Sequence, residues 1–248
     1  MKLFVDAGHG GSDPGVVGHT LEEKTLNLAV ALALEQRLQH CRDIEVMLSR
    51  YADVSMSLQE RTDRANAWGA DVFLSIHHNG FIDPKARGIE TFHSIRPGDS
   101  KQFAEVIQAA LCNTFPLPNR GVKIRLNKAG RDWYHVLRES RAPIAIIAET
   151  GFVTNPEDAK VLRIAAFPAT QAETIAQEIK QHFGIEPKDG PFPDVSINHW
   201  AVDAIAFVSS TEPSIMSGFN DGNFRPNDPV TRAQLASALH RMALYLRR

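Results

Sequence analysis

The chain has 248 residues, of which 43% are hydrophobic and 23% are charged, a composition typical of a soluble globular protein. This length is sufficient for one sizeable domain with a smaller one attached. The formal net charge of -2 gives no electrostatic reason to expect nucleic acid as a partner, and no apolar run approaches the roughly 20 residues that span a bilayer.

Five short runs rich in Val, Ile and Phe predict β-strands. In chain order they are KLFVDAG (2–8), DIEVMLSR (43–50), ADVFLSIHH (70–78), GIETFHS (88–94) and APIAIIAETG (142–151). Amphipathic stretches predict helices over 24–38, 58–69, 100–115 and, after Pro168, 169–183. Strands that alternate with helices favour an α/β fold, with an open, twisted, mostly parallel sheet covered by helices on both faces.

The composition changes near residue 188. The segment 184–193 (GIEPKDGPFP) contains three Pro and two Gly, which suits a linker. Beyond it, HWAVDAIAFV and TRAQLASALHRMALYL predict two helices joined by the turn-rich SGFNDGNFRPNDP. We therefore expect a first domain over 1–184, a linker over 185–190 and a small helical module over 191–248.

Ionisable side chains cluster at the carboxyl ends of the predicted strands. His9 lies in the glycine-rich loop GHGG after the first strand, His77 follows DVFLSI, and Glu149 follows PIAIIA. Glu23 opens the helix that follows the first strand. Because open α/β sheets bind ligands at this edge, we expect these four side chains to converge.

Two imidazoles and a carboxylate are a ligand set that suits zinc and leaves a fourth position for water. The two cysteines, Cys41 and Cys112, are too few and too isolated for a disulfide framework or a sulfur metal site. A bound zinc ion lowers the pKa of its water to about 7, and a nearby free carboxylate can take the proton. Glu149 suits that role, because a carboxylate at the end of a buried strand is costly unless it is paired or used. Its small neighbours Thr150 and Gly151 would leave space for a substrate.

Each of these residues has a structural alternative. Glu23 completes a possible capping box with Thr20 at the start of the helix, and the adjacent His77 and His78 cannot be told apart by spacing. The chain lacks the phosphate-binding and serine-nucleophile motifs that would indicate other chemistry. The remaining histidines have no comparable setting and are interpreted as structural or exposed: His19, His40, His93, His135, His182, His199 and His240.

Four motifs, DAGHGGSDPG, EEKTLNLA, SIHHN and AETGFVTNPED, resemble the N-acetylmuramoyl-L-alanine amidase family called Amidase_3 over about residues 1–183. The resemblance implies His9, Glu23 and His77 as Zn²⁺ ligands and Glu149 as the catalytic residue. It favours Glu23 over Glu22 and His77 over His78. Asn79 of the HxN triplet and Gly151 of the ETGF motif are candidate substrate-binding residues. Family members cleave the amide between N-acetylmuramic acid and L-alanine in peptidoglycan.

Some members of this family carry an inserted helix that blocks the zinc site. Here the stretch from Gly88 to Glu149 is accounted for by a strand, a helix and a segment through RGVKIR and WYHVLRES. We therefore expect a constitutively open site.

The C-terminal region from Pro191 resembles a single S-layer homology (SLH) motif, on the segments FPDV, HWAVDAI, GFNDGNFRP and VTRAQLASAL. The resemblance implies binding to a secondary cell-wall polymer, with Trp200, Arg225 and Arg232 as candidate contacts, since stacking and bidentate charge recognition suit sugars and acidic groups. Such motifs usually occur in threes. This one could assemble with those of other chains, bind weakly alone, belong to a longer array, or merely pack on the first domain.

These observations predict a cell-wall lytic hydrolase, either an endolysin or an autolysin, that acts on peptidoglycan. A zinc peptidase acting within the stem peptide and a non-catalytic wall-binding protein are the alternatives. The N-terminal segment lacks the features of a signal peptide. We expect the protein to reach the cell wall, periplasm or extracellular space by export or by phage-mediated release.

Overall fold

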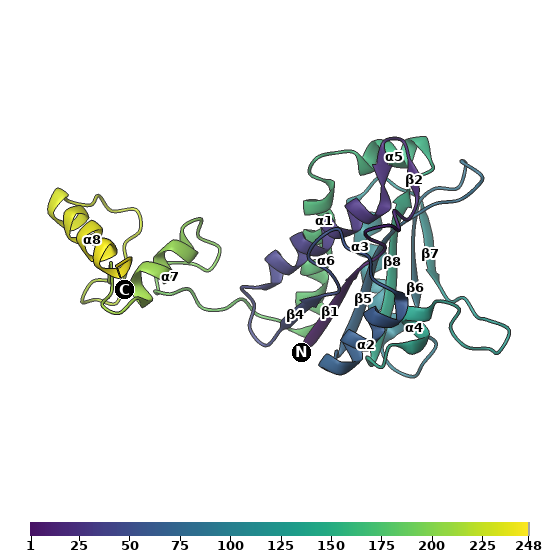
Figure 1. Ribbon diagram of the computed structural model, residues 1–248, viewed down its shortest axis with the longest axis horizontal. Helices are drawn as coiled ribbons and strands as arrows, with labels where there is room; N and C mark the ends of the chain where they lie inside the picture. Colours follow the sequence, from purple (N-terminus) through teal and green to yellow (C-terminus); the bar gives the residue numbers. More distant parts are fainter. Residues whose placement is uncertain (248) are drawn as a thin grey trace. The chain divides into compact units, whose positions relative to one another are not determined.

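The structure, a computed structural model, describes residues 1–247 and divides into two compact units, Met1–Glu186 and Pro187–Arg248. In unit 1, six strands form one sheet in the order β4-β1-β5-β8-β6-β7 (Figure 1). Their bounds are β1 (Lys2–Ala7), β4 (Glu45–Leu48), β5 (Val72–Asn79), β6 (Ile89–His93), β7 (Asn119–Lys123) and β8 (Ile144–Phe152). Only the pairing of β6 with β8 is antiparallel within this sheet, so the predicted mostly parallel architecture is confirmed.

Helices cover both faces of the sheet. On one face lie α1 (Glu23–Leu38), α3 (Ser100–Thr114) and α6 (Phe167–Phe183); the other face carries α2 (Leu58–Trp68) and α4 (His135–Glu139). The short α5 (Pro156–Leu162) follows β8. Pro168 lies in the first turn of α6, where the missing N–H is tolerated, so this helix begins two residues before the predicted position 169.

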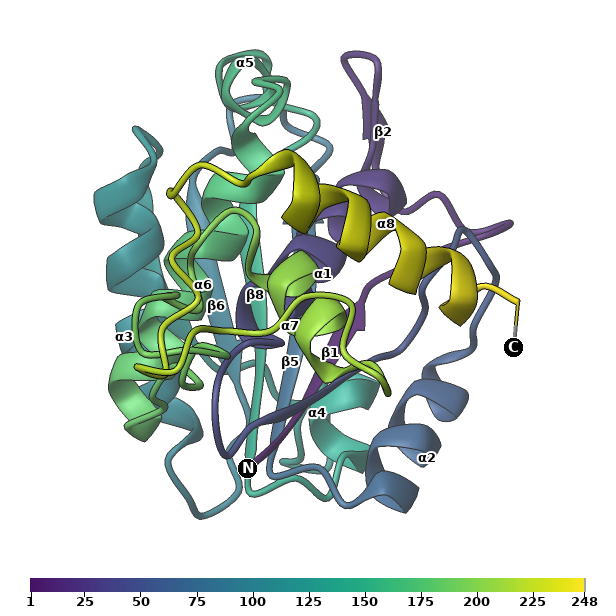
Figure 2. The same ribbon diagram turned by 90° about the vertical axis from the view of Figure 1, so that its left-hand side faces the viewer.

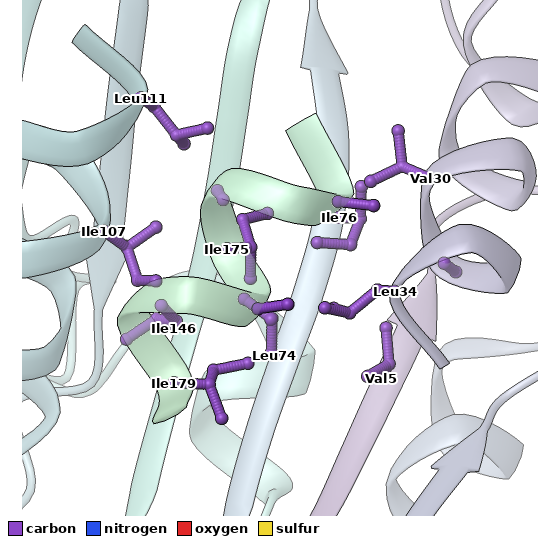
Figure 3. Close-up of a cluster of buried hydrophobic side chains, with 14 of the residues drawn as sticks. Val5, Val30, Leu34, Leu74, Ile76, Ile107, Leu111, Ile146, Ile175 and Ile179 are labelled. Atoms are coloured by element: carbon purple, nitrogen blue, oxygen red, sulfur yellow. The ribbon is translucent and has the colours of Figure 1, made fainter. Parts of the chain in front are cut away.

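Alternate side chains of strand β8 pack into the two core clusters on opposite faces of the sheet, and this alternation positions Glu149. Ile144, Ile146 and Ala148 belong to the cluster under α1, α3 and α6, whereas Ala145 and Ile147 belong to the cluster under α2 and α4. Figure 3 shows Ile146 and its strand neighbours packed against apolar side chains of these helices. Each such buried side chain contributes about 1.5–3 kcal/mol. Because side chains alternate, the next residue of the second set is Glu149, on the face of α2 and α4.

Two features of unit 1 differ from the prediction. The antiparallel pair β2 (Val17–Gly18) and β3 (Leu21–Glu22) and the edge strand β7 were not predicted, because two-residue strands and the polar NRGVK carry no clear periodicity. In addition, the short helix α4 was not predicted, since WYHVLRES was assigned only to an irregular segment.

Unit 2 contains α7 (Val202–Ser210) and α8 (Arg232–Tyr245), joined by a long irregular segment (Figure 2). Both helices occur where the sequence predicts them. The core cluster of its described residues is small and consists of Val195, Val202 and Ile205, with partly buried side chains around them. From α8, only Ala238 is buried.

Candidate metal centre and catalytic pocket

The loop that carries His9 is fixed by two buried arginines. Arg61 pairs with Asp6 (Nη1 to Oδ1, 2.6 Å) and donates to the carbonyls of Ala7 and His9. Arg50 donates from Nε to the same Ala7 carbonyl and from Nη2 to the carbonyl of Gly8. The His9 backbone has φ 60, in the left-handed region, and these charge-assisted hydrogen bonds stabilise it there.

Glu23 is the first residue of α1, and its carboxylate joins the histidines. Its Oε1 lies 2.8 Å from Nδ1 of His77, and its Oε2 lies 3.2 Å from Nε2 of His9. The N-cap of α1 is Glu22, without a side-chain cap, and the Thr20 hydroxyl donates to the carbonyl of His19 instead. The capping-box alternative for Glu23 is therefore wrong.

The adjacent histidines point to opposite sides of β5. His77 faces the cluster with Glu23, whereas His78 is fully buried on the other side, with Nδ1 2.7 Å from Oδ1 of Asn27 and Nε2 3.2 Å from Oε1 of Gln171. Burial in this apolar setting lowers the pKa of His78 to about 4, so its ring is neutral at physiological pH. The structure therefore distinguishes His77 from His78, which their spacing in the sequence could not do.

Two glycines let these side chains approach the backbone. A Cβ at Gly8 would lie 2.3 Å from Nε2 of His77. At Gly15, where φ is +65, a Cβ would lie 2.6 Å from Oε2 of Glu23 and 2.7 Å from Cδ2 of His9. Any larger residue at either position would displace the groups that form the cluster.

The protonation of the cluster is set by the pairing of its members. Burial favours the neutral imidazole of His77, yet the hydrogen bond and charge of Glu23 raise its pKa to about 9. The same two effects of Glu23 raise the pKa of His9 against its own burial. Burial would raise the pKa of Glu23, but His77 and His9 hold it well below its usual range. The cluster therefore contains an ionised carboxylate between two basic rings.

Glu149 lies beside this cluster and has no partner for one oxygen. It pairs with His77 in the register of β5 and β8, and its buried Oε2 has no hydrogen-bond partner. Burial raises its pKa to about 7, although the charge of His77 acts in the opposite direction. A buried, unpaired carboxylate is costly, and it points to a functional use of this oxygen.

These groups share a pocket of about 490 Å³ at the carboxyl edge of β1, β5 and β8. His9 and His77 keep 26% and 20% of their side-chain exposure, so the cluster is open to solvent. Between Gly88 and Glu149 the described chain contains two helices, α3 and α4, where the sequence predicted one, and His135 and Val136 of α4 line the pocket. Ligand atoms of His9, Glu23 and His77 lie within 4.8 Å of one another, so these side chains can hold a metal ion.

Of the two predicted substrate-binding residues, only one lines the pocket. Asn79 lines the pocket and donates from Nδ2 to Oε1 of Glu90 (2.8 Å). Gly151 lies outside the pocket lining, and the space beside its Cα is filled by Leu162 and Leu117. The absence of a side chain at Gly151 therefore permits close packing of these two leucines against β8.

The three predicted wall-binding residues have different settings in the described part of unit 2. Trp200 is 89% exposed, and Arg232 is the first residue of α8. Arg225 lines a separate cavity of about 420 Å³ that contains neither of the other two, and it pairs with Asp221 (Nη2 to Oδ2, 2.7 Å).

Several pocket residues were missed from the sequence. His135 was interpreted as structural or exposed, but it lines the pocket with Tyr134, and its buried Nε2 has no hydrogen-bond partner. Arg61 could have been noticed, because it shares a helix face with Ala65, where an apolar residue would be expected. His135 carries no such signal in the sequence.

Comparisons with known proteins agree with this geometry. Residues 3–181 match the family described as N-acetylmuramoyl-L-alanine amidase (Amidase_3), and residues 191–236 match the S-layer homology domain. The sporulation-specific N-acetylmuramoyl-L-alanine amidase of Bacillus subtilis is 38% identical over 195 residues, covering 75% of this chain and 69% of that protein. N-acetylmuramoyl-L-alanine amidase CwlM of Bacillus licheniformis is 36% identical over 189 residues, covering 75% and 70%. The catalytic domain of CwlV from Bacillus (Paenibacillus) polymyxa var. colistinus superposes with a TM-score of 0.68 at 33% identity, covering 75% of this chain and 99% of that one.

Proposed function

Because this chain belongs to the Amidase_3 family of N-acetylmuramoyl-L-alanine amidases, we propose that unit 1 cleaves the amide between N-acetylmuramic acid and L-alanine in peptidoglycan. In this proposal the metal of the centre is zinc, held by His9, Glu23 and His77. Glu149 is the general base. The observation that carries the proposal is the unpartnered, buried Oε2 of Glu149 beside the metal-binding cluster.

The donor set of this cluster fits zinc by its chemistry. Two imidazole nitrogens and one carboxylate are the three protein ligands of a common type of catalytic zinc site. Asp13 accepts a hydrogen bond at Oδ2 from Nδ1 of His9 (2.8 Å), which orients the ring so that Nε2 faces Glu23. The ring of His77 lies close to the backbone of Gly8, where a Cβ would lie 2.3 Å from its Nε2.

Glu149 is suited to move a proton during amide hydrolysis. When bound, zinc supplies a water of lowered pKa and polarises the carbonyl that is attacked. With a metal bound, the free Oε2 of Glu149 would be placed to accept a proton from the attacking water and to deliver it to the nitrogen of the leaving L-alanine. A pKa of about 7 allows this carboxyl group both to accept and to donate near neutral pH.

Product analysis tests this proposal against a peptidase acting within the stem peptide. Digestion of purified peptidoglycan is expected to leave muramic acid residues without peptide in the glycan strands and to expose new L-alanine amino termini. New amino termini deeper in the stem would refute the amidase assignment. Removal of metal with a chelator and re-addition of zinc should abolish and restore the activity, and metal analysis should find about one zinc per chain.

The match of residues 191–236 to the SLH domain supports a location at the cell wall or outside the cell. We propose that it binds a secondary cell-wall polymer, with contacts from Trp200, Arg225 and Arg232. The high exposure of Trp200 supports a stacking role on a sugar. No helix among the described residues is long and apolar enough to cross a membrane.

Binding of the full chain to isolated sacculi tests the polymer proposal. Sacculi stripped of secondary polymer should bind the protein less than intact sacculi do, and Trp200→Ala should reduce binding to intact sacculi alone. Phe207→Ala, which removes another exposed aromatic side chain of unit 2, is the matched control. Equal binding to both kinds of sacculi would refute the polymer assignment.

A further inference from the structure

The side chains at one edge of the sheet follow the order of the strands. His9 follows β1, His77 lies on β5 and Glu149 lies on β8. The next two strands continue this row, since β6 places Glu90 opposite Glu149 and β7 contributes Arg120 and Lys123. The metal-binding cluster thus lies on one side of Glu149, and cationic side chains lie on the other.

Glu90 holds two of these cations at the site. Its side chain is 8% exposed, and its Oε2 accepts from Nε of Arg120 and from Nζ of Lys123, each at 2.6 Å. Burial would raise the pKa of Glu90, but the two cations keep it below its usual value. One carboxylate therefore serves two cations, which leaves one net positive charge. The guanidinium of Arg120 and the ammonium of Lys123 also have further N–H groups that can donate.

A third cation extends this surface beside the pocket. Arg125 lies over the ring of Trp133, 4.6 Å from its centroid, and its guanidinium carbon lies 5.9 Å from the ring centroid of Tyr134, which lines the pocket. Within the described residues, Arg125 forms no ion pair with a carboxylate. Trp133 is 51% exposed, so this stack faces solvent. We call Arg120, Lys123 and Arg125 the basic wall.

The two halves of the substrate differ in charge, and this decides which half suits the basic wall. In an intact substrate the lactyl carboxyl group is part of the scissile amide, and the N-acetylated sugars are neutral. The stem peptide carries the free carboxylates. Cations beside a substrate path bind carboxylates through charge-assisted hydrogen bonds, so the wall suits the peptide half.

The distance also fits a carboxylate near the start of the stem. Neighbouring strands are about 4.8 Å apart, so β7 lies about 10 Å from β8 and its Glu149. An extended peptide advances about 3.5 Å per residue. Cationic side chains reach inward from β7, so a carboxylate two residues beyond the scissile bond falls within their range.

We propose that the basic wall binds the free α-carboxylate of the second stem residue, so that the enzyme prefers stems in which this group is not amidated. The proposal rests on the amidase function proposed above. Arg120, Lys123 and Arg125 are specificity residues in this scheme, and Glu90 positions two of them.

The test uses two synthetic muramoyl tripeptides, MurNAc-L-Ala-γ-D-Glu-L-Lys with the glutamate α-carboxyl either free or converted to an amide. The zinc-loaded full chain is compared with Lys123→Gln, Arg125→Gln and the control Lys128→Gln. Lys128 is an exposed cation of the same loop as Arg125, so its substitution matches the change in charge. Thermal melting of each variant checks folding, and Lys123→Arg tests rescue by a conserved charge.

We expect wild type to favour the free carboxylate by about tenfold in kcat/KM, the value of one charge-assisted hydrogen bond at a partly exposed site. Lys123→Gln and Arg125→Gln should reduce this preference through KM for the free-acid substrate, leaving the amidated one unchanged. Lys128→Gln and Lys123→Arg should retain it. Equal kcat/KM of wild type on both substrates, or an equal loss on both in the variants, would overturn the proposal.

A binding measurement separates this inference from the proposed function. Calorimetry of Glu149→Gln with the same two muramoyl tripeptides measures binding to the basic wall without hydrolysis. Preference for the free acid in binding, with neither substrate cleaved by wild type, would support the wall and refute the amidase function. Absence of any preference in both binding and turnover would refute the wall, whatever the rate of hydrolysis.

Discussion

The two units of the molecule differ in how their functional side chains are held. In unit 1, Glu23 and the supporting Arg61 are each 2% exposed, and each face of the sheet carries an apolar cluster. In unit 2, the described core cluster is small, and its candidate contact Trp200 is 89% exposed.

This difference predicts two kinds of mutational effect. Substitution of a buried polar side chain lowers the free energy of unfolding as well as the activity, because its former partner stays buried without a hydrogen bond. An exposed side chain can be removed with little effect on folding. Substitutions in unit 1 should therefore couple activity to structure, and changes in unit 2 should affect only attachment to the wall.

Glu149→Gln should have the largest effect. Loss of the general base is expected to lower kcat by about 10²- to 10⁴-fold. Metal content and folding should persist, because Glu149 is not among the clustered ligands and its Oε2 has no partner to lose. Turnover of a muramoyl peptide measures kcat, and metal analysis measures the metal content. The exposed Glu157→Gln is the control, and equal turnover by wild type and Glu149→Gln would contradict the mechanism.

His77→Ala should weaken zinc binding by more than about 100-fold, which is the upper range for loss of a residue that only supports a ligand. A competitive chelator titration measures this affinity. His240→Ala, an exposed histidine of unit 2, should leave it unchanged. Full zinc affinity in His77→Ala would remove this residue from the ligand set.

The pH dependence of stability should reveal the buried His78. Its pKa is about 4 in the folded protein and about 6.5 in the unfolded chain, so the unfolded state binds more protons between these values. The stabilisation is therefore present above pH 6.5 and is lost as the pH falls. By pH 5 the metal-free protein should lose about 2 kcal/mol through this group. Denaturant unfolding at pH 7 and pH 5 measures the loss, and His78→Gln should lack this component. The same pH dependence in that variant would assign it to another residue.

Removal of unit 2 should have the smallest effect on catalysis. Residues 1–186 alone should keep the melting temperature of unit 1 and turn over small muramoyl peptides within about twofold of the full chain, since they contain the whole pocket. Retention on intact sacculi should fall by about tenfold, because a linked second binding site is lost. A large loss of turnover on small peptides would instead show that the pocket depends on unit 2.

Much of the fold was predictable because strong local patterns agree with the tertiary arrangement. The runs that became β1, β5 and β8 are continuous apolar segments, as expected for strands buried on both faces. Edge strand β7 was missed because its NRGVK sequence is polar on an exposed edge. Its residues Arg120 and Lys123 were missed with it.

For the site, the sequence by itself determined which chemical groups are available at the carboxyl edge of the sheet: His9, His77 and Glu149 next to apolar strands, with Glu23 at a helix start. Only the tertiary structure decided which of them meet. The choice of His77 over His78 depends on which side of β5 faces α2, and the role of Glu23 depends on a loop that prevents helix capping. The contact that selects His77 joins segments more than 50 residues apart, through the 2.8 Å pairing of Glu23 with His77. Spacing along the chain carries no record of such contacts, because they form only when the sheet assembles.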